Sequence, residues 1–265
     1  MKIEFHYTYL IVAFSFIITG LFPNLLIFTS IIIFHELGHY ILAKINKLNP
    51  QKIVIYPYGG ITKIDNLINT KIAKELITAI AGITFQIIYY MIIIILYKNN
   101  IIREYIFNIF TKYHYSILFF NLLPIHPLDG SKILNLLLSY IFPYKLTIKL
   151  NIIISIISGI FIMYINYYNL NYTTILIITI IIDSIIKYIK NINYLFNKFL
   201  LERYLYKIDL NKRKQITKID NMYKEKYHII KYHNKYLTEK QFLIDRFRGK
   251  NIKNIWLYID NMLKL

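Results

Sequence analysis

Long apolar runs are the feature of this chain that most limits its possible folds. A helix of about 20 predominantly apolar residues matches the hydrocarbon core of a bilayer. Six such runs are predicted, at about residues 6–21, 24–45, 72–97, 105–123, 148–167 and 172–189. Hydrophobic residues make up 56% of the chain and its mean hydropathy is +0.43, both too high for a soluble domain. We therefore expect an α-helical polytopic membrane protein with six transmembrane helices.

The second apolar run contains three ionisable residues within five positions: His35, Glu36 and His39. Such groups are costly at membrane depth unless they form a functional site. Residues four apart lie on one face of a helix, so His35 and His39 can bind one metal ion while Glu36 lies beside it. This H-E-x-x-H pattern is typical of zinc metalloproteases, in which the glutamate is the general base.

A catalytic zinc ion needs a third protein ligand, and the chain has no cysteine. Asp129 is the best candidate because Pro127 and Gly130 flank it in a break between apolar runs, where a carboxylate can point back at the second run. A metal-binding role for the neighbouring His126 stays open. Asp183, in the last apolar run, is expected near a membrane end, and an inward polar contact is the alternative.

Two short β-prone runs follow the metal-binding segment, at residues 53–56 and 61–64. The Pro/Gly-rich turn between them predicts a β-hairpin that is too short to span a membrane and lies beside the metal-binding helix. An ordinary surface loop is the alternative.

The segment after residue 190 has a different composition. Residues 187–264 contain 19 Lys and Arg against seven Asp and Glu, which predicts a cytoplasmic location. A capping-box pattern predicts a helix over residues 238–247, with strands at 227–230 and 254–258. We expect a membrane domain at 1–190 and a basic αβ module at 191–265, with both termini in the cytoplasm.

Three motifs together resemble the site-2 protease family of intramembrane zinc metalloproteases. They are H-E-L-G-H at 35–39, Y-P-Y-G-G at 56–60 and N-L-L-P-I-H-P-L-D-G at 121–130. The order and spacing look most like the sporulation branch of that family. The resemblance implies that His35, His39 and Asp129 bind one zinc ion and that Glu36 is the catalytic base. It also implies that Asn121, Gly59 and Gly60 contact the substrate.

The same resemblance implies a substrate and a location. The substrate would be the membrane-tethered precursor of a sporulation sigma factor. Cleavage would take place in a bacterial cell membrane or in the outer membrane of a forespore. The basic tail resembles a single CBS-like module that would contact substrate or bind a nucleotide, and resting on anionic lipid is the alternative. Regulatory membrane proteins are further candidate partners, and nucleic acid is not expected.

A zinc-binding membrane scaffold or transporter is the rival function. A transporter would need several metal-binding sites along a transport pathway, whereas the sequence contains one cluster of candidate metal ligands with a general base.

Overall fold

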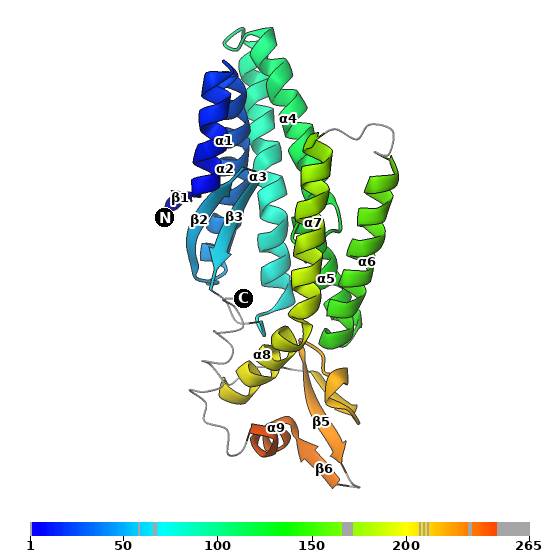
Figure 1. The fold of residues 1–265 in the computed structure, drawn as a ribbon. Coiled ribbons are helices and arrows are strands. Elements are labelled where there is room, and N and C mark those ends of the chain that lie inside the picture. Colours follow the sequence, from blue (N-terminus) through cyan, green and yellow to red (C-terminus); the bar gives the residue numbers. More distant parts are fainter. Residues whose placement is uncertain are drawn as a thin grey trace. The chain divides into compact units, whose positions relative to one another are not determined.

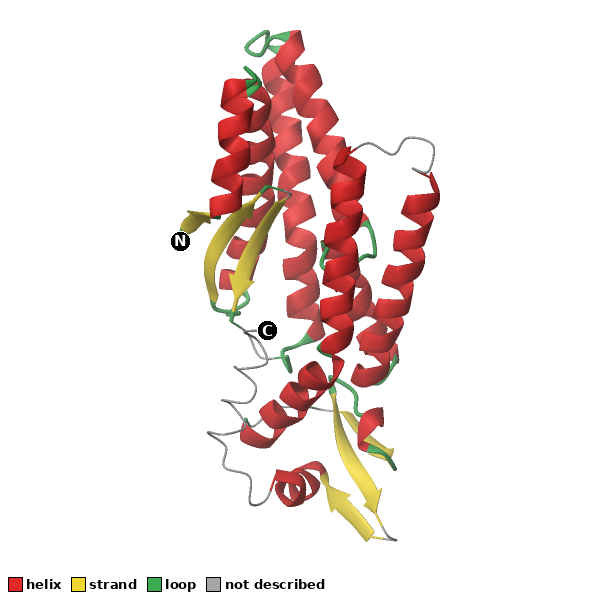
Figure 2. Ribbon diagram, viewed as in Figure 1, coloured by secondary structure: helices red, strands yellow, loops and turns green. Residues whose placement is uncertain are grey.

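The computed structural model describes residues 2–57, 59–65, 68–165, 172–206, 208, 210, 212–232 and 235–247. Most of these residues are helical, and two small three-stranded sheets complete the fold (Figure 2). The chain divides into two compact units. The N-terminal unit comprises 1–66, 73–123 and 128–133, and the C-terminal unit comprises 67–72, 124–127 and 134–265.

The N-terminal unit is built on four helices and the start of a fifth (Figure 1). They are α1 (Tyr7–Ile18), α2 (Phe22–Ile45), α3 (Ile72–Lys98), α4 (Glu104–Leu122) and α5 (Asp129–Ile141). Proline is tolerated in the first turn of a helix because its missing N–H has no partner there, so α2 begins before Pro23. The segment with the H-E-x-x-H pattern therefore lies in one continuous helix, as predicted.

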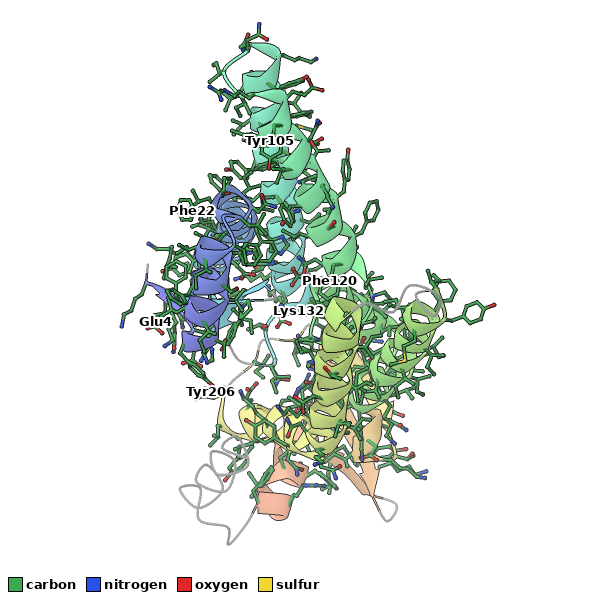
Figure 3. The ribbon with its side chains drawn as sticks, turned by 45° about the horizontal axis from the view of Figure 1, so that its top comes forward. Glu4, Phe22, Tyr105, Phe120, Lys132 and Tyr206 are labelled. Atoms are coloured by element: carbon green, nitrogen blue, oxygen red, sulfur yellow. The ribbon has the colours of Figure 1, made fainter. Side chains whose placement is uncertain are left out.

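In the described part of the chain, three helices are long and apolar enough to cross a membrane: α2, α3 and α6 (Tyr144–Ile165). Helix α1 has 12 residues and is about 18 Å long, which is shorter than a bilayer core. Helix α4 has 19 residues but carries Lys112 and His114. Exposed apolar side chains such as Phe22 and Tyr105 project from the helices of this unit, as suits contact with lipid (Figure 3).

The first sheet has the order β1-β2-β3, with strands Ile3–Phe5, Pro50–Tyr56 and Gly59–Ile64. Strands β2 and β3 are antiparallel, with Ile55 opposite Gly60, so the predicted hairpin is confirmed. Strand β1 was not predicted; it pairs in parallel with β2. The sheet packs on α2 through the buried side chains of Ile53 and Ile55, which join the cluster around Ile32.

The C-terminal unit combines apolar helices with the basic tail. After α6 it contains α7 (Tyr172–Lys190), α8 (Ile192–Leu205), β4 (Lys212–Ile216), a 3₁₀ turn (Ile219–Asn221), β5 (Lys226–Tyr232), β6 (Lys235–Thr238) and α9 (Glu239–Phe247). Strand β5 pairs in parallel with β4 and antiparallel with β6.

The structure confirms two predicted elements of the tail. Strand β5 contains the predicted run 227–230, and α9 begins after Thr238. The capping box forms, because the Gln241 N–H donates to Oγ1 of Thr238 while the Thr238 N–H donates to Oε1 of Gln241. The predicted strand at 254–258 lies outside the described residues. The boundary at 190/191 stays a prediction.

Candidate metal centre

Helix α2 buries all three ionisable side chains of its motif. His35, Glu36 and His39 are 2%, 5% and 6% exposed, and one ligand atom from each lies within 4.8 Å of the others. The glycine of the motif explains why this face is closed. A Cβ at Gly38 would lie 2.8 Å from the carbonyl carbon of Ala81, so only glycine lets α3 approach so closely.

Asp129 joins the two imidazoles although it lies about ninety residues further along the chain. Its Oδ2 lies 2.8 Å from Nε2 of His35 and 3.0 Å from Nε2 of His39, and the two Nε2 atoms are 3.2 Å apart. Asp129 is the first residue of α5 and is 4% exposed. The structure thus brings together the three residues predicted as metal ligands.

The chemistry of these donors fits a metal ion. Nδ1 of His39 lies 2.8 Å from the carbonyl oxygen of Thr78, which can only accept, so Nδ1 carries the proton and Nε2 presents a lone pair. That lone pair faces a carboxylate oxygen at 3.0 Å, and a metal ion bound by both atoms would satisfy the two acceptors. Tetrahedral ligands at about 2.0–2.1 Å from zinc are roughly 3.3 Å apart, close to the separations found here. Glu36 lies beside this donor set as a fourth ionisable group.

The β-hairpin contacts Glu36 directly. The Thr62 hydroxyl, on β3, donates to Oε2 of Glu36 at 2.6 Å. A Cβ at Gly60 would lie 2.8 Å from Cδ of Glu36, so the backbone of β3 lies against the carboxylate. Gly60 therefore lies at the site as the motif implies, whereas Thr62 was not predicted.

Three further residues around the donors were not predicted as part of the site. A Cβ at Gly82 would lie 2.8 Å from Nε2 of His35, so glycine leaves room for the imidazoles. Nζ of Lys132 donates to Oδ1 of Asp129 at 2.8 Å, and Gln86 contacts Nδ1 of His35. Helical spacing could have indicated Lys132, because it follows Asp129 by three residues.

The remaining residues that the sequence singled out have surroundings that differ from those of the three donors. Asn121 lies half-buried in the last turn of α4, and Gly59 begins β3. In the C-terminal unit, Nδ1 of His126 lies 2.9 Å from Oγ of Ser184, and the ring stacks on Tyr188. Asp183 pairs with Lys187 at 2.7 Å and its side chain is 61% exposed, so it makes a helix-surface ion pair.

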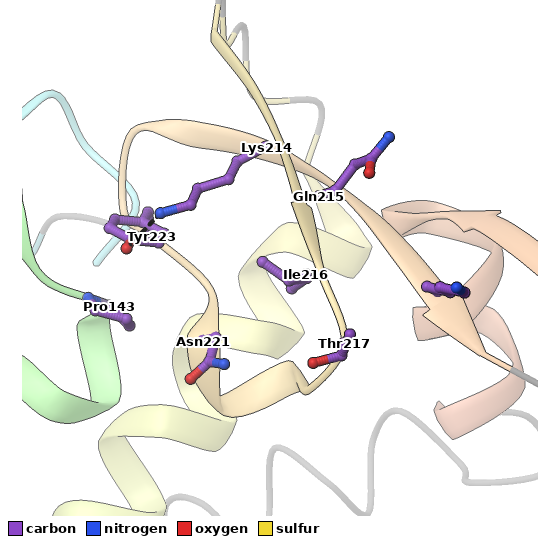
Figure 4. Close-up of a pocket in the computed structure, with 8 residues that line it drawn as sticks. Pro143, Lys214, Gln215, Ile216, Thr217, Asn221 and Tyr223 are labelled. Atoms are coloured by element: carbon purple, nitrogen blue, oxygen red, sulfur yellow. Dashed lines mark hydrogen bonds between the residues drawn. The ribbon is translucent and has the colours of Figure 1, made fainter.

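A second concave site lies in the C-terminal unit, with a volume of about 420 Å³ (Figure 4). Lys214, Tyr223 and Lys231 give it a basic and aromatic lining. Nζ of Lys214 donates to the Tyr223 hydroxyl at 2.6 Å. A pocket of this composition suits an anionic group.

Comparisons with known proteins point to one class. Residues 23–102 match the model of Peptidase family M50. The chain is 32% identical over 169 residues to stage IV sporulation protein FB of Bacillus subtilis, covering 62% of this chain and 59% of that protein. It is 27% identical over 163 residues to a zinc metalloprotease of Methanocaldococcus jannaschii, covering 57% and 46%. The chain thus spans less than two thirds of the length of these relatives.

The solved structure of the site-2 protease from Methanocaldococcus jannaschii has the same fold, with a TM-score of 0.55 and 24% identity over 70% of this chain and 90% of that one. The fold and the matched family point to one class, that of membrane-associated metallopeptidases, which this chain resembles. More particularly, residues 23–102 match peptidase family M50, the site-2 protease family, in agreement with the resemblance stated from the motifs. The sporulation branch fits the match to the Bacillus subtilis protein.

Proposed function

We propose that the chain is an intramembrane zinc metalloprotease that hydrolyses a peptide bond of a membrane-associated protein. The observation that carries this proposal is the convergence of Nε2 of His35, Nε2 of His39 and Oδ2 of Asp129 on one point beside the buried carboxylate of Glu36. These three atoms would hold one zinc ion. The match to family M50 and the similarity to a zinc metalloprotease support zinc as the metal.

When bound, zinc supplies Lewis acidity that polarises the scissile carbonyl and lowers the pKa of a bound water molecule. Glu36 accepts the proton of the attacking water and returns it to the leaving amine. The β3 backbone at Gly60 and the Thr62 hydroxyl hold the carboxylate in place.

A substrate helix must unwind locally, because an intact helix shields its peptide bonds. Strand β3 ends the sheet order, and an extended substrate segment would pair with it next to Glu36. Gly59 and Gly60 would contact this segment, and Asn121 would bind the substrate backbone. The contact between Gly60 and Glu36 supports the placement of the substrate segment beside β3.

The membrane arrangement is part of the same proposal. Six spans would place both termini in the cytoplasm of a bacterial cell, with residues 191–265 forming a CBS-like module. The pocket of Lys214, Tyr223 and Lys231 would be the place for a nucleotide or another anionic partner on that module. The substrate class would be the membrane-tethered precursor of a sporulation sigma factor, cleaved in the cell membrane or the outer forespore membrane.

The function is tested by comparing cells that express the unmodified chain with cells that express Glu36→Gln. Glutamine fills the same space but cannot accept the water proton. Mass spectrometry of new protein termini should find cuts in membrane-tethered proteins only with the unmodified chain. Equal fragments in both cells would contradict Glu36 as base. A zinc-loaded chain that cuts nothing in either cell would favour the rival scaffold or transporter.

A further inference from the structure

Gln86 is the one amide side chain that contacts a donor of the metal centre in the described part of the chain. It lies on α3, is 0% exposed and makes two side-chain hydrogen bonds. Its Nε2 lies 2.9 Å from the carbonyl oxygen of His114 on α4, and its Oε1 lies 3.0 Å from Nδ1 of His35 on α2. The amide therefore links three helices.

The carbonyl of His114 fixes the orientation of this amide. A backbone carbonyl only accepts hydrogen bonds, so the amide group that faces it must be the NH₂. The oxygen of Gln86 is then the atom that faces His35. Because that oxygen only accepts, Nδ1 of His35 must carry the ring proton.

A neutral imidazole has one proton, so Nε2 of His35 is left with a lone pair. This nitrogen is the one that faces Oδ2 of Asp129 at 2.8 Å and Nε2 of His39 at 3.2 Å. The same result holds for His39 through the Thr78 carbonyl. Both imidazoles are therefore held in the tautomer that a metal ion requires.

We propose that Gln86 is a positioning residue of the metal centre, which sets the tautomer and ring orientation of His35 by a relay from the α4 backbone. The inference rests on the proposed zinc site and adds a residue that the motifs do not contain. Outer hydrogen-bond partners of metal-bound histidines contribute 10–100-fold to metal affinity in general.

The experiment measures zinc affinity of the purified full-length chain in detergent by competition with a chromogenic chelator. Gln86→Leu keeps a similar volume and removes the acceptor, so we expect roughly 10–100-fold weaker zinc binding. In its protonated form, Gln86→Glu keeps an oxygen for His35 and an O–H that donates to the His114 carbonyl, so it should restore binding close to the unmodified level. Thr84→Val, at an exposed position of the same helix, is the control.

The absorption spectrum of the cobalt-substituted chain gives a second readout. A change in the ring orientation of His35 should shift the cobalt bands in Gln86→Leu and not in Gln86→Glu or Thr84→Val. Unchanged zinc affinity in Gln86→Leu, or equal losses in the leucine and glutamate variants, would overturn the positioning role. If the unmodified chain itself binds no zinc, the proposed function fails, and this inference fails with it.

Discussion

The ammonium of Lys132 donates to Oδ1 of Asp129 at 2.8 Å, while Oδ2 of the same carboxylate faces the two imidazoles of α2. The two oxygens of Asp129 are thus divided between a fixed cation on its own helix and the predicted metal position. The side chain of Lys132 is 58% exposed, whereas that of Asp129 is 5% exposed. Lys132 can therefore be changed without opening the buried part of the site.

We expect Lys132→Met to weaken zinc binding by about tenfold, because Asp129 loses the partner that orients it. Lys132→Arg should restore most of the affinity, since arginine also donates to a carboxylate. Lys112→Met, at an exposed position of α4, serves as the control. Chelator competition measures all three, and undiminished affinity in Lys132→Met would rule out the orienting contact.

Gly60→Ala should impair cleavage while zinc stays bound. The added Cβ would collide with the side chain of Glu36, whereas the three predicted metal ligands are untouched. A displacement of about 1 Å of a catalytic group can cost roughly 10²-fold in rate. The matched control is Gly159→Ala in α6, where an added Cβ meets nothing within 4 Å. Full activity in Gly60→Ala would show that β3 does not constrain the base.

The C-terminal unit contains a buried ionic network that makes its stability depend on pH. Burial lowers the pKa of His228, although Glu239 opposes the shift. The Tyr223 N–H donates to Nε2 of His228 at 3.0 Å, which fixes the neutral form. Burial alone would raise the pKa of Glu239, but the hydrogen bond from His228 and the charge of Arg203 hold it below its ordinary value.

The pKa values of His228 and Glu239 are both lower in the folded chain than their ordinary values. The unfolded chain takes up a proton on His228 below about pH 6.5, before the folded chain does, so stability falls as the pH drops from there. Glu239 adds a second loss as the pH falls from its ordinary value near 4.5 through its lowered folded pKa. Hydrogen exchange of the β5 amides between pH 7 and pH 4 measures this loss of stability. Protection that stays constant below pH 6.5 would contradict it.

Glu239→Gln should destabilise the same unit by roughly 3–5 kcal/mol, because it leaves the buried guanidinium of Arg203 without its carboxylate. Arg203 Nη1 lies 2.9 Å from Oε1 of Glu239, and both side chains are buried. The control is Asp220→Asn, which removes a half-exposed partner of Lys145. Thermal unfolding of the full chain compares the two variants, and equal midpoints would refute a structural role for the buried pair.

Much of the metal centre could be predicted because spacing along one helix determines geometry. His35, Glu36 and His39 needed only helical periodicity, and Asp129 needed a chain break that could carry a carboxylate. Gln86 and Thr62 could not be predicted, because their contacts depend on how α3 and β3 pack on α2. Strand β1 was missed because three residues are too short for a periodic pattern.

The six-span prediction shows a different limit. Apolar composition identified the helices but not their lengths, and α1 has only 12 residues. The predicted run 6–21 continues into a turn in which Gly20 has a φ of 72°. Because such a φ suits glycine and ends a helix, the apolar run extends further than the helix itself.

In the proposed metal centre, His35, His39 and Asp129 hold one zinc ion. The most direct test is the zinc content of the purified full-length chain, compared among the unmodified protein, Asp129→Ala and Asp183→Ala. Asp183 is a matched carboxylate control, because it is exposed and pairs only with Lys187 among the contacts described above. We expect about one zinc ion per chain in the unmodified protein and in Asp183→Ala, and loss of zinc in Asp129→Ala. Full zinc occupancy in Asp129→Ala would contradict this expectation.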